Sequence, residues 1–88
     1  MNAARVMMYS TKSCPYCAWA RELLARKRLP FEDIDVGADP ARRAEMHGRS
    51  GRYTVPQVFI GSTHVGGYEE LHALDSDGRL DALLGLGS

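Results

Sequence analysis

The two cysteines of the chain lie three positions apart, in the segment Ser13-Cys14-Pro15-Tyr16-Cys17. Thiols at this spacing can form a reversible disulfide, supply half of a metal site or serve as a structural crosslink. A secreted domain of 88 residues would usually carry four or more cysteines as a disulfide framework, so a structural crosslink is the weakest of the three interpretations. A reactive pair and a metal site remain.

A metal site would need more ligands than this pair provides. Structural zinc takes four protein ligands, and the other candidates, His47, His64 and His72, follow no recognised ligand spacing. We therefore expect no metal ion, and we interpret the histidines as surface residues at a helix end, in a hairpin and on a helix. The sequence favours a reactive pair of thiols.

The local sequence predicts that the two thiols differ. Cys14 is expected to be the N-cap of a helix that begins at Pro15, so the free N–H groups of the first turn point toward its sulfur. The positive end of the helix dipole and the nearby Lys12 favour the thiolate form of Cys14. Cys17 lies on the same face, deeper along the helix and with fewer donors. We expect Cys14 to be the nucleophile and Cys17, with a higher pKa, to be the resolving thiol.

Hydrophobic periodicity predicts an α/β arrangement around the pair. The expected strands cover residues 5–9, 31–36, 58–60 and 63–65, and the last two form a hairpin through Gly61-Ser62. The expected helices cover residues 15 to about 28, 39 to about 48, 68–74 and 80–84. A loop over residues 10–13 joins the first strand to the first helix.

The balance of charged residues limits the classes of binding partner that we expect for this chain. Eleven basic and eleven acidic residues cancel, so net charge gives no reason to expect a nucleic acid or a membrane partner. The first apolar segment is too short for a signal-peptide core or a membrane span. We expect a single soluble domain over residues 1–88, monomeric and cytoplasmic.

Three motifs, in this order, resemble the glutaredoxin family. Cys14-Pro15-Tyr16-Cys17 follows a short apolar strand, Thr54-Val55-Pro56 precedes a strand, and Gly66-Gly67 is followed by acidic residues. The resemblance covers about residues 5–84 and is greatest to the small bacterial class I dithiol members. It implies a thioredoxin fold, with a four-stranded mixed sheet flanked by three to four helices.

The resemblance also implies an activity. It indicates a glutathione-dependent thiol-disulfide oxidoreductase that reduces protein–glutathione mixed disulfides and protein disulfides through Cys14 and Cys17. Glutathione would be a co-substrate, the other partners would be glutathionylated or disulfide-containing client proteins, and no cofactor would be tightly bound. Two alternatives remain: a thioredoxin-like reductant served by a flavoprotein reductase, and a dimer that binds an iron–sulfur cluster through Cys14 and glutathione.

The second motif is expected to bind the backbone of glutathione. In the family its Val-Pro bond is cis and lies beside the active cysteine, so Val55, between Thr54 and Pro56, would present its N–H and C=O to the ligand. The alternative is that this segment only begins an edge strand. Tyr16 is expected to line the groove. For Trp19, a position on the helix surface and a contact with a partner both remain open, and packing is the favoured interpretation.

The third motif and several charged residues are expected to bind the two ends of glutathione. The turn at Gly67 would hold the γ-glutamyl end at a helix N-terminus. Tyr68 stands where the family often has serine, alanine or cysteine, and Glu69, where aspartate is usual, would meet the γ-glutamyl ammonium. Lys12 and Arg43 would clamp the glycyl carboxylate. Alternatively, the acids of this turn are dipole partners, and the arginines of the basic segment around the second helix, Arg42, Arg43, Arg49 and Arg52, form a solvated face.

Overall fold

The sheet is organised around its first strand. In the computed structural model, which describes residues 5–86, β1 (Val6–Ser10) lies between β2 (Glu32–Asp35) and β3 (Gln57–Ile60), and β4 (Thr63–Gly66) follows β3 at one edge. β1 pairs in parallel with β2 and antiparallel with β3, and β3 pairs antiparallel with β4. This confirms the four-stranded mixed sheet that the sequence predicted. The helices are α1 (Pro15–Arg26), α2 (Pro40–Ser50), α3 (Tyr68–Ser76) and α4 (Arg79–Leu84).

β1 takes the interior position because both of its faces are apolar. Successive side chains of a strand point to opposite faces of a sheet. Met8 packs on one face with Leu23 of α1 and Leu71 of α3, whereas Tyr9 packs on the other with Met46 of α2. Each of these large side chains is fully buried, and burial of a residue such as leucine stabilises the fold by ~1.5–3 kcal/mol. The strand is therefore covered by helices on both sides.

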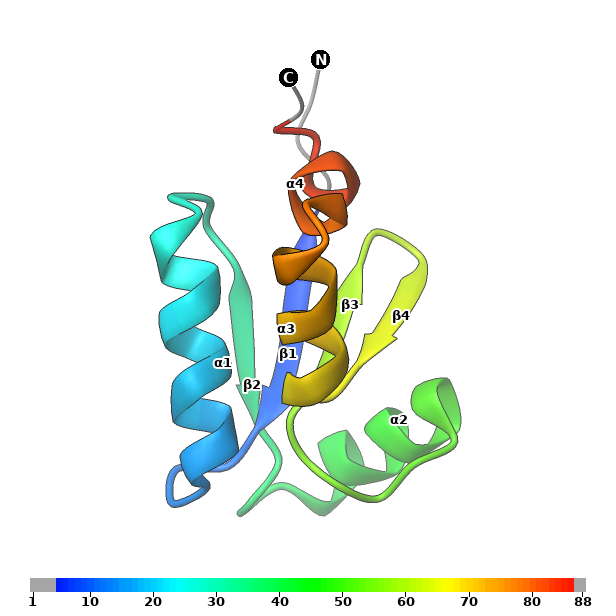
Figure 1. Cartoon of the computed structure of the whole chain (residues 1–88). Helices are drawn as coiled ribbons and strands as arrows, with labels where there is room; N and C mark the ends of the chain where they lie inside the picture. Colours follow the sequence, from blue (N-terminus) through cyan, green and yellow to red (C-terminus); the bar gives the residue numbers. More distant parts are fainter. Residues whose placement is uncertain (1–4, 87–88) are drawn as a thin grey trace.

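The helices form two layers around the sheet. α1 and α3 lie side by side over one face, and α2 packs on the other, toward the end where β1 stops (Figure 1). At the opposite end of α1, Lys27 pairs with Asp75 of α3 at 2.6 Å and with Asp81 of α4 at 2.9 Å. The N-termini of α1 and α3 lie together at the other end of the molecule, where Cys14 and Cys17 are found.

α2 is set by its capping residues. The Asp39 carboxylate accepts a hydrogen bond from the Arg42 N–H at 3.1 Å, which satisfies a donor of the first turn. The helix continues past its predicted end near Gly48 because Gly51, with φ of 72°, adopts the left-handed conformation that ends it. Gly48 is an ordinary helical residue, and sequence alone did not distinguish the two glycines.

The end of β1 differs from the prediction. Ser10, expected in the loop, is the last strand residue and is buried. Its carbonyl accepts from the Val36 N–H at 2.8 Å, its hydroxyl donates to Asp33, and Arg21 donates to that hydroxyl at 3.0 Å. Pairing of this polar residue extends the strand beyond its apolar run.

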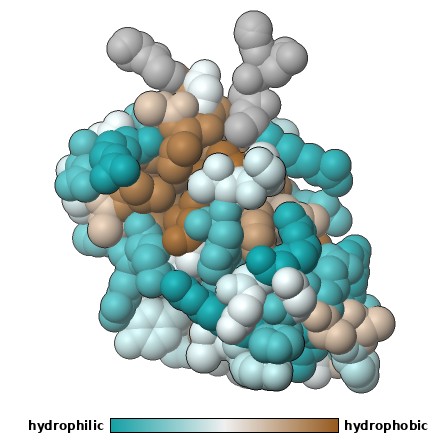
Figure 2. Space-filling model, turned by 90° about the vertical axis from the view of Figure 1, so that its right-hand side faces the viewer, coloured by the Kyte–Doolittle hydropathy of each residue, from teal (hydrophilic) through white to brown (hydrophobic). Residues whose placement is uncertain are grey.

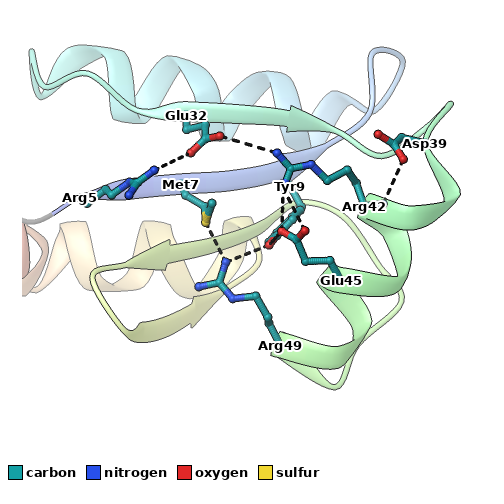
Figure 3. Close-up of polar contacts among 8 residues, drawn as sticks. All are labelled: Arg5, Met7, Tyr9, Glu32, Asp39, Arg42, Glu45 and Arg49. Carbon is teal, nitrogen blue, oxygen red and sulfur yellow. Dashed lines mark hydrogen bonds and ion pairs between the residues drawn. The ribbon is translucent and has the colours of Figure 1, made fainter.

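A polar network fastens α2 to the sheet (Figure 3). The fully buried Tyr9 hydroxyl donates to Glu45 of α2 and accepts from Arg49 of the same helix at 2.9 Å. Arg42 pairs with Glu45 at 2.9 Å and approaches Glu32 of β2 at 4.0 Å. Burial, followed by the bond to Glu45, raises the pKa of Tyr9, so the phenol remains a donor at neutral pH. Two arginines that the sequence placed on a solvated face are therefore bound to the sheet or its neighbours.

The edge of the sheet beyond β4 is only partly covered. Figure 2 shows hydrophobic side chains gathered in the upper part of this face. A hollow between β4, α3 and α4 is lined in part by Val65, Leu74 and Leu83, which pack against the main core. Among residues 5–86, no helix has the length and apolar character needed to cross a membrane.

Removal of the Tyr9 hydroxyl tests the network. Tyr9→Phe keeps the ring but leaves Glu45 and Arg49 without their shared partner, so we expect a loss of about 1 kcal/mol in the free energy of unfolding. For a domain of this size, the melting temperature should fall by about 4–8 °C, measured by circular dichroism. Tyr53→Phe is the matched control because the Tyr53 side chain is 67% exposed. Equal melting temperatures for wild type and Tyr9→Phe would contradict a stabilising role for the network.

Candidate active site

The two cysteines occupy different environments at the start of α1. Cys14 is the N-cap, in extended conformation, and Pro15 is the first helical residue, as predicted, but the Cys14 side chain accepts no capping hydrogen bond from the first turn, contrary to the expectation. Cys14 is partly exposed, whereas Cys17 is fully buried and belongs to the face of α1 that carries Ala20 and Leu23. Both are free thiols. Only the Cys14 sulfur is open to a molecule approaching from solvent.

Burial changes the acidity of the second thiol. Loss of solvent raises the pKa of Cys17 from 9.0 to about 11, and the adjacent Cys14 side chain adds to the rise. A hydrogen bond with the Thr11 backbone opposes it without cancelling it. Cys17 is therefore protonated at neutral pH, in agreement with the expectation of a higher pKa for the deeper thiol.

Arg21 holds the loop that leads into Cys14. Its guanidinium donates to the Thr11 carbonyl at 3.1 Å and to the Ser10 hydroxyl at 3.0 Å, and it forms an ion pair with Asp33 at 2.5 Å. The ion pair with Asp33 is the main reason that the pKa of Arg21 is raised. The arginine thus ties α1, β2 and the loop together. Lys12 lies exposed in this loop.

The segment Thr54-Val55-Pro56 lies against the first cysteine. The Val55–Pro56 bond is cis, and the Cys14 sulfur is 3.9 Å from the Val55 carbonyl oxygen. The segment leads into β3, which is an interior strand, so the interpretation of an edge strand is wrong. Thr54 is exposed, Val55 half-buried and Pro56 buried. The backbone of Val55 is thus presented beside the reactive end of α1.

The buried side chain of Gln57 holds the Thr54-Val55-Pro56 segment in place through hydrogen bonds. Its side chain is completely buried and donates to the Thr54 carbonyl at 3.0 Å and to the Thr54 hydroxyl at 3.2 Å. Its oxygen pairs with His64 Nε2 at 2.7 Å, and the His64 ring stacks on Phe59. Burial lowers the pKa of His64, so the ring is neutral at pH 7. His64 is therefore part of a packed hydrogen-bond chain and not the surface residue expected from the sequence.

The turn at Gly66-Gly67 requires glycine and leads into α3. Gly66 has φ of 118°, and a Cβ at this position would lie 2.8 Å from a Glu70 carboxylate oxygen. That carboxylate accepts from the Gly67 N–H at 2.7 Å and pairs with Arg52 at 3.4 Å. The bond from Gly67 is the main reason that the pKa of Glu70 is lowered. Glu70 thus stabilises the first turn of α3, while Glu69 stays exposed.

A groove of about 310 Å³ joins these segments. It lies within the size range of small-molecule sites. The residues that line it are Tyr16, Arg52, Thr54, Val55, Pro56, Gln57, Gly67, Tyr68, Glu69 and Glu70. Seven of these were predicted from the sequence to bind glutathione, namely Tyr16, Thr54, Val55, Pro56, Gly67, Tyr68 and Glu69.

Two predicted residues lie elsewhere, and three lining residues were not predicted. Within residues 5–86, the groove lining includes neither Lys12 nor Arg43, which is half-buried on α2. Arg52, Gln57 and Glu70 line it instead. Arg52 stood within a recognised basic segment and only two residues before Thr54, a proximity that could have identified it. Gln57 gave no such signal because its role depends on its burial.

The described part of the chain contains no cluster of three or more His, Cys, Asp or Glu side chains with the arrangement of a metal site. The groups available at the site are the Cys14 sulfur, 3.9 Å from the Val55 carbonyl oxygen, and, in the adjacent groove, backbone amides and carbonyls with charged side chains at the rim. This set suits exchange between thiols and disulfides, with a peptide-like ligand held along Val55.

Alkylation with iodoacetamide tests the difference between the thiols. In Cys17→Ser, we expect rapid modification of Cys14 at neutral pH because the sulfur is accessible. In Cys14→Ser, modification of Cys17 should be slow and should rise about tenfold per pH unit below its pKa, which burial alone still raises in this variant. Intact mass measured over time gives both rates. Equal rates at neutral pH would contradict the assignment.

Comparisons with known proteins agree with this geometry. A family model described as glutaredoxin matches residues 6–65. A glutaredoxin of Pseudomonas aeruginosa is 51% identical over 79 residues, which are 90% of this chain and 94% of the relative. Glutaredoxin 3 of Escherichia coli K12 is 47% identical over 81 residues, which are 92% of this chain and 98% of the relative.

Solved structures give the same result. The solution structure of glutaredoxin from Brucella melitensis superimposes with a TM-score of 0.85 and 52% identity, covering 100% of this chain and 96% of that one. The crystal structure of a buckwheat glutaredoxin–glutathione complex has a TM-score of 0.84 and 26% identity, covering 97% and 83% respectively. The fold is the thioredoxin fold. Because the family model spans more than half of the chain and the relatives align over nearly all of it, this chain belongs to the glutaredoxin family of thiol-disulfide oxidoreductases.

Proposed function

We propose that this protein is a glutathione-dependent oxidoreductase that removes glutathione from glutathionylated proteins and reduces protein disulfides. The observation that carries the proposal is the 3.9 Å contact between the Cys14 sulfur and the Val55 carbonyl, because Val55 also lines the groove and so joins the accessible thiol to it. The buckwheat relative, solved as a complex with glutathione, supports the same choice of ligand. We assign the activity to the cytoplasm, where glutathione keeps thiols reduced, and to a monomer.

Glutathione is a short peptide, and the groove offers groups that match its parts. Its central residue would pair with the backbone of Val55, as an added strand does. Its γ-glutamyl carboxylate would accept from the first-turn amides of Tyr68 and Glu69, which have no acceptor within α3. Glu69 would meet the γ-glutamyl ammonium. The Gly67 amide is already bound to Glu70, so it contributes through the shape of the turn.

The glycyl end of glutathione would meet a cation. Lys12 and Arg43 are the residues that the family resemblance assigns to it, and this assignment remains a prediction. Arg52 is a further candidate because it lines the groove, and its pair with Glu70 at 3.4 Å joins two half-exposed side chains. Such pairs contribute little to stability, so the guanidinium can turn toward a ligand at small cost.

The reaction follows from the two thiols. The Cys14 thiolate attacks the glutathionyl sulfur of a mixed disulfide, that S–S bond breaks, and the client thiolate leaves and takes up a proton. The thiolate of a second glutathione then attacks the same glutathionyl sulfur, now bound to Cys14. This step yields oxidised glutathione and restores the Cys14 thiolate. One disulfide is exchanged at each step, and the two electrons come from glutathione.

The second thiol is needed only for protein disulfides. Cys14 would first form a mixed disulfide with the client, and Cys17, after losing its proton, would attack the Cys14 sulfur and release the client. Two glutathiones then reduce the Cys14–Cys17 bond. The raised pKa of Cys17 leaves this thiol mostly protonated at neutral pH, so its attack on glutathionylated Cys14 is slow and a second glutathione reacts there first.

Turnover of a glutathionylated peptide, coupled to glutathione reductase and NADPH, tests the proposal. We expect wild type and Cys17→Ser to be active, and we expect Cys14→Ser to lose activity by at least ~10³-fold because no accessible thiolate remains. With a protein disulfide as substrate, Cys17→Ser should also be inactive. A wild type that turns over only with a flavoprotein reductase, and not with glutathione, would overturn the proposal.

A further inference from the structure

Four aromatic rings gather where the N-terminal turns of α1 and α3 meet. Tyr16 and Trp19 of α1 contact each other edge to face, with centroids 5.1 Å apart. Tyr68 of α3 lies 6.4 Å from the Tyr16 ring and 5.8 Å from the Trp19 ring, and His72 lies 5.7 Å from Tyr68. We call these four residues the aromatic cluster.

The aromatic cluster is too exposed to serve only as packing. The side chains of Tyr16 and Trp19 are each 49% exposed, and His72 is exposed as well. An exposed patch of large aromatic rings is typical of a contact surface because such rings gain much from being covered. Trp19, interpreted from the sequence as a packing residue, thus offers half of its surface to a partner.

The aromatic cluster continues the groove. Tyr16 and Tyr68 belong to both, so a molecule that leaves the groove past these rings passes over Trp19. If glutathione occupies the groove, the client polypeptide, which is joined to glutathione through the disulfide, must extend out of the groove at the Cys14 end. The first turn of α1, which carries Tyr16, begins directly after Cys14. The rings therefore lie where residues flanking the client cysteine would pass.

Charge at the rim indicates which residues would suit the rings. Glu69 is exposed and lines the groove beside Tyr68. Glu22 is exposed one turn after Trp19, on the same face of α1. Neither carboxylate forms an ion pair within the described part of the chain, residues 5–86. Ring faces carry partial negative charge, so the rings and Glu22 together form a surface that attracts a cation when Glu69 is paired with the γ-glutamyl ammonium of glutathione.

We propose that the aromatic cluster binds an arginine or lysine side chain that flanks the glutathionylated cysteine of a client protein. The inference rests on the proposed function, because it assumes that glutathione fills the groove and that the client polypeptide leaves over α1. The cationic group stacks over Trp19 and Tyr68, and Glu22 adds Coulomb attraction, while Glu69 is engaged by the γ-glutamyl ammonium of the bound glutathione. The aromatic cluster thereby selects clients by the residues around their modified cysteine.

Three glutathionylated peptides test the selection. They are identical except that the residues flanking the cysteine are arginine, leucine or glutamate. We expect kcat/KM for the arginine peptide to exceed that for the leucine peptide by about fivefold, the effect of one exposed cation–π contact, and the glutamate peptide to be the slowest. In Trp19→Ala the arginine and leucine peptides should differ by less than about twofold. Tyr53→Ala is the matched control, since it removes an exposed ring that stacks on His47 outside the aromatic cluster.

A small substrate separates this inference from the proposed function. The mixed disulfide of glutathione and 2-mercaptoethanol has no flanking residues, so wild type and Trp19→Ala should reduce it equally. Wild type that fails on this substrate overturns the proposed function. Wild type that reduces this substrate but does not distinguish the three peptides overturns the inference alone. A preference for the leucine peptide also overturns it, because the aromatic cluster would then bind an apolar side chain.

Tryptophan fluorescence provides a second readout that leaves the aromatic cluster unchanged. Trp19 is the only tryptophan of the chain. Cys17→Ser whose Cys14 carries glutathione retains that glutathione because the resolving thiol is absent, and it can be titrated with peptides in which serine replaces the cysteine. The arginine peptide should change the Trp19 emission with an affinity that weakens as salt is added, and the glutamate peptide should leave the emission unchanged. Equal responses to both peptides would contradict the inference.

Discussion

The unequal burial of two neighbouring sulfurs is the constraint on which the rest of the site depends. Cys17 has no exposed surface because its face of α1 packs into the core, whereas Cys14, at the N-cap, remains in contact with solvent. One helical turn thus separates a buried thiol with a pKa of about 11 from a partly exposed thiol that contacts Val55 at the groove. This difference sets the order of the exchange reactions, because a disulfide substrate in solution can contact the Cys14 sulfur but not the Cys17 sulfur.

The fold maintains this difference by fixing what surrounds Cys14. Arg21 holds the preceding loop against β2, and Gln57 holds the Thr54 backbone from beneath. Glu70 shapes the entry to α3 through its bond to the Gly67 amide. Each of these side chains acts on backbone rather than on a ligand. Their common effect is a preformed groove, which lowers the conformational cost of binding a flexible peptide.

Sequence reasoning succeeded where a residue type dictates local geometry. Pro15 marks the start of a helix, an apolar run marks β1, and a glycine pair marks a turn, so the elements and the thiols could be placed. It failed where a role depends on distant partners. Gln57 bonds Thr54 and His64 only because β3 is buried. Such pairings arise from tertiary packing and leave no local pattern.

The most direct test of the account is to map the ligand on the protein. Cys17→Ser carrying one glutathione on Cys14, compared with its reduced form by amide chemical shifts, reports where the tripeptide lies. The account predicts that the largest changes occur at Val55 and over residues 67–69, with small changes in β4 and α4. Changes concentrated in the hollow between β4, α3 and α4, with Val55 and residues 67–69 unaffected, would contradict it.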